Sequence, residues 1–270
     1  RTADVVIVGA GVIGSATAFE LAKRGYKTLN IDKLPASGYG STSNSCAIVR
    51  AHYSTWDGVA MAYEGFFYWA DWNKYLEVED ERGMAKYMKT GSIMFMLKGA
   101  DHTKKSLKLF KQIGVEHEVW DLETLKKKMP IYSHDSFNGT SRPDEDDSFF
   151  DKSGDQIEGA VWTPGSGYVS DPQLSTHNLQ VATEAKGGEF LFNAEIMEIR
   201  QSNGQIQGVT LKSGEQIDCK VLVNVAGPHS FIINQMAGVE DDMKIKTKAL
   251  RHEVHHVSSP PGFDFEKDGV

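Results

Sequence analysis

The sequence predicts an α/β protein in which a doubly wound domain is interrupted by a smaller α+β segment. A short, β-branched apolar run over residues 3–9 leads directly into a glycine-rich turn and a helix. Another apolar run, over residues 216–227, ends in Ala226 and Gly227. Between these regions the pattern changes to short strands mixed with amphipathic helices. We therefore expect one domain built from separated segments, with a second domain on a mixed sheet inserted into it.

The composition is that of an ordinary globular protein with a core. The 270 residues are 40% hydrophobic and 24% charged. The net charge of −8 argues against nucleic acid or an anionic membrane as a main partner, and no apolar run is long enough to span a bilayer. Cys46 and Cys219 make neither a disulfide framework nor a metal cluster, which predicts a reducing, cytoplasmic location.

Two local patterns mark a helix start and exclude a calcium site. Asp171 and Pro172 have the residue types of an N-cap and a first helical turn. The carboxylates around residue 145 lack the spacing of a calcium loop. No metal site is predicted. The expected elements are strands over 3–9 and 27–32, helices over 12–24 and 58–76, two strands within 85–97, helices over 101–114 and 121–130, a solvated loop over 133–156, a helix over 170–188, strands over 189–201, 204–214 and 216–227, a helix over 229–238 and a strand over 248–257.

These elements predict two domains. Residues 1–80 and 158–243 are expected to form the doubly wound domain, and residues 81–157 and 244–270 an incomplete second domain. The chain stops just after an expected strand, without an element to close it, so we expect it to be part of a longer protein.

The first turn has a dinucleotide-binding fingerprint. Gly9 allows a tight turn, Gly11 allows close approach of a pyrophosphate, and Gly14 allows close contact between helix and strand. The helix N-terminus offers free N–H groups to the phosphates. Asp32 ends the next strand and can accept hydrogen bonds from ribose hydroxyls, which disfavours NADP. The fingerprint alone leaves FAD, NAD and a turn that binds nothing as alternatives.

Several further stretches carry a family resemblance. "VVIVGAGVIGSATAFELAKRGYKTLNIDK", "STSNSCAIVR", "GAVWTPGSGYVSDPQL" and "VLVNVAGPHS" occur in an order and spacing that resemble the D-amino-acid oxidase superfamily of FAD-dependent oxidoreductases. The sarcosine oxidase and dimethylglycine dehydrogenase branch is the most similar. The resemblance implies a Rossmann-like FAD-binding domain (GR2-type) with an inserted α+β substrate domain. It also implies a C-terminal segment or a partner subunit that completes the substrate site.

The resemblance assigns cofactor contacts residue by residue. The glycine turn would hold the FAD pyrophosphate, and the residues after the second strand would hold the adenosine ribose. A polar loop would line the phosphates and ribityl chain, a later strand would meet the adenine through its backbone, and the Ala-Gly turn would close the site. In order, the residues are Gly9, Gly11, Gly14, Asp32, Lys33, Ser41, Thr42, Ser43, Ile196, Ala226 and Gly227.

The same loop bears on how the flavin is attached. Asn44 stands where dimethylglycine dehydrogenase relatives carry a His that bonds covalently to the flavin, and Asn has no ring nitrogen for that bond. Monomeric sarcosine oxidases use a Cys from a region without a counterpart here. Cys46 is an alternative, although a free Cys is more often a small buried hydrophobe. Non-covalent FAD is therefore predicted.

Arg50 and Tyr53 are the predicted substrate contacts. In sarcosine oxidases, an Arg at the matching position binds the substrate carboxylate, and a Tyr lies nearby. A guanidinium suits this role because it is a planar, bidentate donor that stays charged when desolvated. The alternative is a local ion pair between Arg50 and Asp57. Ala47 replaces a second Arg of those relatives. His252, Glu253, His255 and His256 are further candidates for proton transfer, although structural or surface roles are commoner for such residues.

The resemblance implies an FAD-dependent amine oxidase or dehydrogenase. Its substrate would be a secondary or tertiary amino acid such as sarcosine or dimethylglycine, its C–N bond oxidised by hydride transfer to flavin N5. Oxygen or another electron acceptor would reoxidise the flavin. The alternatives are a dehydrogenase for proline, another amino acid or a 2-hydroxy acid, and a non-catalytic flavin-binding subunit or assembly factor.

Overall fold

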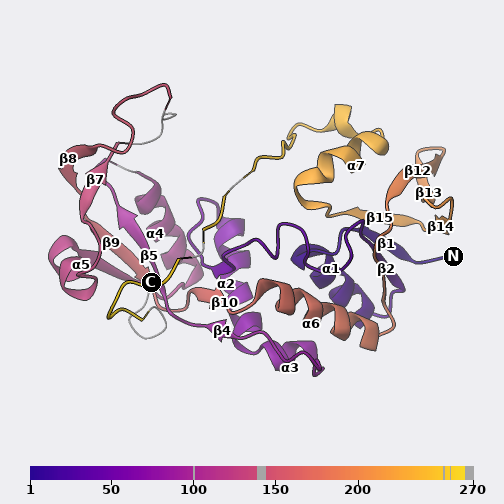
Figure 1. Cartoon of the computed structure of the whole chain (residues 1–270), viewed down its shortest axis with the longest axis horizontal. Coiled ribbons are helices and arrows are strands. Elements are labelled where there is room, and N and C mark those ends of the chain that lie inside the picture. Colours follow the sequence, from indigo (N-terminus) through magenta and orange to yellow (C-terminus); the bar gives the residue numbers. More distant parts are fainter. Residues whose placement is uncertain (100, 139–143, 252, 256, 265–270) are drawn as a thin grey trace. The chain divides into compact units, whose positions relative to one another are not determined.

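The structure is a computed structural model that describes residues 1–99, 101–138, 144–251, 253–255 and 257–264 (Figure 1). The chain divides into two units. The first unit contains Arg1–Ala47, Asp71–Tyr87 and Val169–Val257, and the second contains Ile48–Ala70, Met88–Tyr168 and Ser258–Val270. The functional domain boundaries given above stay predictions, because compactness alone does not assign a function to a segment.

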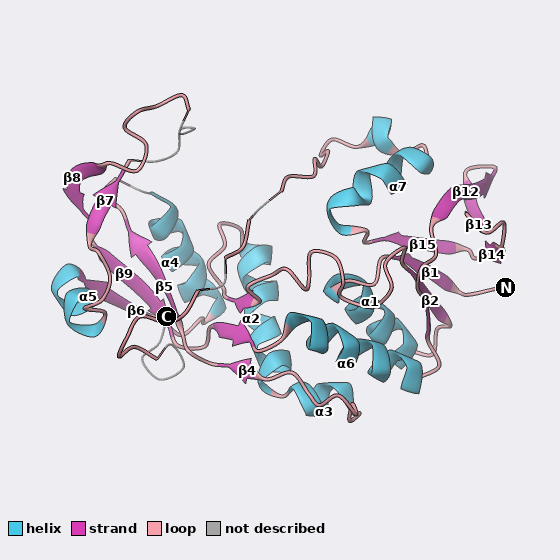
Figure 2. Cartoon of the chain, in the orientation of Figure 1, coloured by secondary structure: helices cyan, strands magenta, loops and turns pink. Residues whose placement is uncertain are grey.

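A four-stranded parallel sheet forms the centre of the first unit. The strands lie in the order β11-β2-β1-β15, with Val5 opposite both Thr28 and Val221. β1 and β2 are buried along their whole length, as expected for parallel strands covered on both faces. Helix α1 packs against helix α6 (Figure 2). The bounds are β1 Val5–Val8, α1 Val12–Lys23, β2 Thr28–Ile31, α6 Pro172–Ala185, β11 Glu189–Leu191 and β15 Val221–Asn224.

A three-stranded antiparallel sheet adds to the same core. Its strands are β12 (Ile196–Ser202), β13 (Gln205–Leu211) and β14 (Gln216–Asp218). Val209 and Ile217 have no exposed surface and belong to one hydrophobic cluster with Val6 and Leu29 of the parallel sheet. The remaining elements of this unit are α3 Trp72–Leu76, η1 Gly227–His229, α7 Ser230–Met236 and η2 Glu240–Asp242.

Two expected strands of this unit are each divided into two. The run 189–201 forms β11 and β12, which belong to different sheets, because Asn193 adopts a left-handed φ of 53° between them. The run 216–227 forms β14 and β15, again in different sheets. Hydrophobic alternation identifies strand residues but does not show where a chain leaves one sheet for another.

The long helix expected over residues 58–76 is also two helices. Helix α2 (Trp56–Ala70) ends before Asp71, whose φ of −116° and ψ of 41° are not helical, and α3 begins at Trp72. The apolar pattern continues through this break because both helices bury aromatic residues, Phe66 in α2 and Trp72 in α3. The prediction of one continuous helix was therefore wrong.

The second unit is built on the antiparallel sheet β5-β9-β6. Val59 and Phe66 of α2, Phe110 of α4 and Val161 of β9 form its main hydrophobic cluster. Helix α4 confirms the helix expected over 101–114, and Phe110 is a buried residue of it. The predicted loop over 133–156 also contains a strand pair, β7 with β8. The bounds are β3 Ile48–Val49, β4 Tyr87–Met88 at the passage between the units, β5 Ser92–Met96, α4 Asp101–Ile113, β6 Glu118–Asp121, α5 Leu122–Lys128, β7 Asp135–Phe137, β8 Lys152–Gln156, β9 Gly159–Thr163 and β10 Gly167–Val169.

The strand expected over residues 248–257 was wrong for the part that the structure describes. Residues 248–251, 253–255 and 257 form no strand and are exposed, including Glu253 and His255. The predictions for His252 and His256 concern residues outside those that the structure describes. Within the described chain, every helix is too short or too polar to cross a lipid bilayer, and no group of three His, Cys, Asp or Glu residues is placed to hold a metal ion.

Candidate functional site

The glycine turn between β1 and α1 has no room for side chains at two positions. Gly9 has a φ of +112°, and a Cβ atom there would lie 2.5 Å from the carbonyl oxygen of Val225. A Cβ atom at Gly14 would lie 2.1 Å from the carbonyl oxygen of Gly9. Gly11 is the N-cap of α1, so the turn presents the helix N-terminus. This arrangement fits a pyrophosphate, which needs close approach to main-chain N–H groups and favours the positive end of a helix.

Asp32 stabilises this turn from the end of β2. Its Oδ2 atom accepts a hydrogen bond of 2.8 Å from the N–H of Ala10, and its Oδ1 atom accepts one of 2.9 Å from the N–H of Leu34. A carboxylate oxygen can accept a further bond, so the same side chain can also bind ribose hydroxyls. Sequence reasoning predicted the ligand contact and missed the structural one, because no sequence motif specifies which N–H groups a carboxylate meets.

The polar loop after β2 lies against the same turn. Thr42 Oγ1 accepts a hydrogen bond of 3.1 Å from the N–H of Val12, in the first turn of α1. Ser43 Oγ donates to the carbonyl oxygen of Gly40 at 3.2 Å, whereas Ser41 is exposed. Thr42 is thus placed at the helix N-terminus, where phosphates would bind. The predicted contacts of all three hydroxyls with the cofactor stay predictions.

The return of the chain after β15 completes the turn region. The N–H of Val225 donates to the carbonyl oxygen of Val8 at 3.1 Å, which brings the following Ala226 and Gly227 beside the glycine turn. Ile196, at the start of β12, is 8% exposed and belongs to the core cluster of the first unit. Its backbone contact with adenine stays a prediction.

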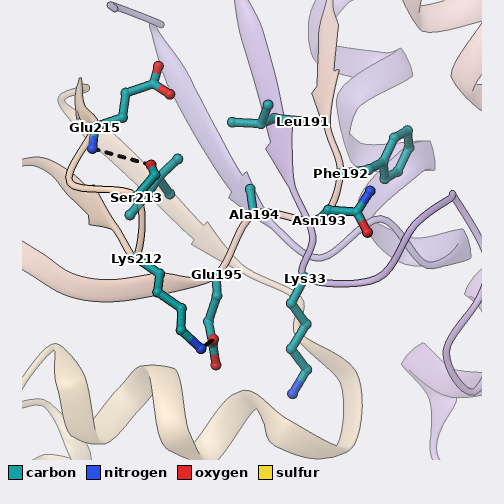
Figure 3. A pocket seen from close by; sticks show the side chains of 10 residues that line it. Lys33, Leu191, Phe192, Asn193, Ala194, Glu195, Lys212, Ser213 and Glu215 are labelled. Carbon is teal, nitrogen blue, oxygen red and sulfur yellow. Dashed lines mark hydrogen bonds and ion pairs between the residues drawn. The ribbon is translucent and has the colours of Figure 1, made fainter.

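Lys33 lines a pocket of about 470 Å³ in the first unit (Figure 3). In Figure 3, the Lys33 and Lys212 side chains extend in the same direction, and Lys212 Nζ donates to Glu195 at 2.8 Å. This hydrogen bond and the Lys212 charge hold the pKa of Glu195 below its ordinary value. Sequence reasoning missed the pocket because its walls are distant in the chain. The lining residues are Lys33, Leu191, Phe192, Asn193, Ala194, Glu195, Leu211, Lys212, Ser213 and Glu215.

Arg50 and Tyr53 lie together in the second unit. Arg50 Nη1 donates to the carbonyl oxygen of His52 at 2.8 Å, and its guanidinium carbon is 5.4 Å from the centre of the Tyr53 ring. Both side chains are exposed. Within the described residues Arg50 forms no ion pair, so its predicted alternative partner, Asp57, does not hold it. A charged, bidentate donor is therefore open to an anionic ligand.

His52 is a residue of this region that sequence reasoning missed. Its Nε2 atom shares a hydrogen bond of 3.0 Å with Thr163 Oγ1. Burial and the nearby Arg50 charge lower the pKa of His52 to about 4, so the imidazole is neutral at physiological pH. Its partner is 111 positions away in the sequence, and nothing in the local pattern identifies the pair.

Comparison with known proteins decides the family. A family model described as DAO, FAD dependent oxidoreductase, matches residues 4–269. The chain belongs to this family. The match confirms the predicted α/β class, the Rossmann-like cofactor domain and the FAD cofactor, with which the geometry of the glycine turn is consistent.

Three similar proteins illustrate the range of this family. The chain is 26% identical over 271 residues to sarcosine oxidase subunit beta of Rhodobacter capsulatus, covering 95% of this chain and 57% of that protein. It is 24% identical over 258 residues to the mitochondrial pyruvate dehydrogenase phosphatase regulatory subunit of Mus musculus, covering 93% and 25%. The solved structure of L-proline dehydrogenase from P. horikoshii has the same fold, with a TM-score of 0.70, 23% identity and coverage of 89% and 57%. The chain thus spans less than two thirds of the length of each.

Proposed function

We propose that the protein containing this chain oxidises the C–N bond of a small secondary or tertiary amino acid. Arg50 carries the proposal. Its guanidinium is exposed, held from one side by the His52 carbonyl and the Tyr53 ring, and unpaired with any described carboxylate. In a family of FAD-dependent oxidoreductases, such a group suits the carboxylate that distinguishes an amino acid from a simple amine.

The described residues would divide the work between two regions. The glycine turn and the N-terminus of α1 would hold the pyrophosphate of FAD, with Asp32 at the ribose. Arg50 would bind the substrate carboxylate and thereby orient the amine for oxidation. FAD, when bound, supplies the acceptor for the hydride equivalent. We further propose non-covalent attachment, since Asn44 Nδ2 donates to the Gly40 carbonyl and has no chemistry for a flavin bond.

Substitution of Arg50 tests this function. In the full-length, FAD-bound protein, we expect Arg50→Ala to raise the KM for sarcosine about 100-fold, because the substrate carboxylate loses its charged, bidentate partner. Arg50→Lys should recover part of the loss, since Lys keeps the charge without the fork. Arg24→Ala is the control, because Arg24 is exposed at the C-cap of α1, and among the described residues its ion pair is with Glu20 of the same helix. An unchanged KM in Arg50→Ala would exclude the carboxylate clamp.

The alternative substrate classes can be distinguished by testing which electron donor reduces the flavin. Proline, another amino acid or a 2-hydroxy acid also carries a carboxylate, so Arg50 would serve each of them. Anaerobic bleaching of the flavin by sarcosine, dimethylglycine, proline and a 2-hydroxy acid in turn would identify the substrate class. Oxygen or another acceptor would then restore the colour.

A non-catalytic role has its own support. The mouse regulatory subunit is similar over 93% of this chain, so the fold also occurs in a protein whose name denotes regulation. A flavin-bound, full-length protein that no donor bleaches would favour a flavin-binding subunit. A location in the cytoplasm stays a prediction from the cysteine content.

A further inference from the structure

A cluster of hydroxyl groups in the second unit contacts His52, which belongs to the loop of residues 50–53, called the Arg50 loop below. Thr163 Oγ1, at the end of β9, is within 2.9 Å of Ser92 Oγ and 2.8 Å of Ser166 Oγ, besides its bond of 3.0 Å to His52. Thr163 and Ser166 have no exposed surface. The cluster therefore joins three segments that are distant in sequence, and a buried hydrogen-bonded network of this kind holds its members in one arrangement.

The His52 ring is also fixed on its apolar side. It packs against Phe110 of α4, with ring centres 5.6 Å apart, and Phe110 is fully buried. The preceding residue, Ala51, is fully buried as well. Buried neighbours on both sides leave the imidazole little rotational freedom, so the main chain at His52 is held in place by its own side chain.

The main chain at His52 in turn holds Arg50. The His52 carbonyl oxygen accepts the hydrogen bond of 2.8 Å from Arg50 Nη1, and the Tyr53 ring lies beside the same guanidinium. One nitrogen of the guanidinium is thus occupied, and Arg50 makes no ion pair with a described carboxylate.

We propose that His52 is a positioning residue for Arg50: its ring, held by Thr163 and Phe110, fixes the carbonyl that orients the guanidinium toward a substrate carboxylate. This inference rests on the proposed function of Arg50. The charge state of the ring is consistent with the role. A neutral imidazole can hold the main chain at His52 without placing a second positive charge beside Arg50. Such a charge would repel the guanidinium and hold it less firmly.

The test compares two substitutions of His52 in the full-length, FAD-bound protein. His52→Leu keeps a similar volume and removes the bond to Thr163, and we expect it to raise the KM for sarcosine about 10-fold with little change in kcat. His52→Gln can place an amide near the position of Nε2, so it should restore the KM to within about 3-fold of the wild-type value. Acetate, titrated by flavin difference spectra, gives a readout without turnover, and its Kd should rise with the KM.

His117→Leu is the matched control. The His117 ring packs against the same Phe110 side chain, with ring centres 5.5 Å apart, but its Nδ1 atom meets the carbonyl of Val115 and not the Arg50 loop. It should leave both the KM for sarcosine and the Kd for acetate unchanged. If His52→Leu does not fold, Thr163→Val removes the same hydrogen bond at the other end and should give the same rise in both constants.

The outcomes separate this inference from the function on which it rests. Weaker acetate binding in Arg50→Ala together with normal binding in His52→Leu and Thr163→Val would overturn the positioning role and leave the carboxylate clamp intact. Normal acetate binding in Arg50→Ala would overturn both. A KM that rises equally in His52→Leu, His52→Gln and His117→Leu would show that loss of packing around Phe110, and not the hydrogen bond, is responsible, which also overturns the proposal.

Discussion

The glycine turn of the first unit and the Arg50 loop of the second unit are specified in different ways. The helix side of the turn depends on main-chain geometry within a few positions: Gly14 must lack a side chain because the Gly9 carbonyl is in the way. The loop depends on side chains from distant segments, because His52 meets Thr163 across 111 positions. A steric requirement between neighbours leaves a recognisable motif in the sequence, whereas a hydrogen bond between distant side chains leaves none.

The two regions should also respond differently to substitution. A Cβ atom that clashes with the main chain cannot be accommodated by a side-chain rotation, since the backbone of a strand or helix must move. A lost side-chain hydrogen bond has a graded cost, which depends on whether the former partner finds water or another group. Large losses of stability are therefore expected for substitutions in the glycine turn, and smaller, graded losses of stability for substitutions around Arg50.

The largest effect is expected for Gly14→Ala. The new Cβ atom would lie 2.1 Å from the Gly9 carbonyl oxygen, so α1 must move away from β1. We expect a loss of about 3 kcal/mol in the free energy of unfolding and a loss of bound FAD. Urea unfolding and the flavin content of the purified protein measure the two effects.

Gly65→Ala is the matched control for this substitution. Gly65 lies inside α2, and apart from its chain neighbours and the nearby backbone of its own helix, no described atom lies within 4 Å of the position of its Cβ. Alanine there should stabilise the protein by about 0.5–1 kcal/mol, because it lowers the conformational entropy of the unfolded chain. Equal losses in both variants would contradict the steric account.

A smaller loss is expected for Asp80→Asn, which weakens a buried side-chain network of the first unit. Asp80 Oδ2 accepts from His177 Nδ1 at 2.6 Å and from Asn178 Nδ2 at 2.8 Å, and Oδ1 accepts from the N–H of Arg82 at 2.9 Å. An amide cannot accept all of these bonds, so we expect a loss of about 2 kcal/mol in chemical denaturation. Asp71→Asn, at an exposed N-cap without a side-chain cap bond, should change stability little.

The same carboxylate has a defined pH dependence. Burial raises the pKa of Asp80, but the hydrogen bonds from Arg82, His177 and Asn178 outweigh burial and lower that pKa overall. The stabilisation is therefore complete above the ordinary pKa of 3.8 and is lost as the pH falls through the lowered value in the folded protein. Asp80→Asn should lack this acid loss, and a wild-type acid profile in the variant would argue against the network.

Asp32→Ala should mainly weaken the binding of FAD. Removing the carboxylate leaves the N–H groups of Ala10 and Leu34 without acceptors and deprives FAD of a ribose contact. We expect the affinity for FAD to fall about 10-fold. Asp4→Ala is the control, since Asp4 Oδ2 also accepts from a main-chain N–H, that of Lys27, but away from the turn. Flavin titration of both apoproteins should show a change only in Asp32→Ala.

At neutral pH, the smallest effect is expected from protonation of His52. Its pKa is about 4 in the folded protein and 6.5 for an unperturbed His, so the unfolded chain binds more protons between these values. Stability should therefore be complete above pH 6.5 and fall as the pH drops toward 4. NMR titration of the ring gives the pKa directly, and an ordinary value near 6.5 would contradict a buried, neutral imidazole.

The sequence by itself determined the parts of the protein that depend on near neighbours. The β1–turn–α1 unit, Gly14 and the N-cap at Asp171 were predicted because each requirement is met within a few residues. Gly9 and Asp32 were predicted because their spacing belongs to the dinucleotide-binding fingerprint. The FAD-dependent family followed from several such units in order, and the family match confirmed it.

Only the tertiary structure decided where a continuous pattern divides and which distant side chains meet. The break at Asp71, which separates α2 from α3, lies within an apolar run that looks uninterrupted. The bonds of Asp32 to Ala10 and of His52 to Thr163 join segments that have no local pattern in common. The physical reason is the same in each case: periodicity reports which residues are buried, whereas the partner of a buried group is set by how the elements pack.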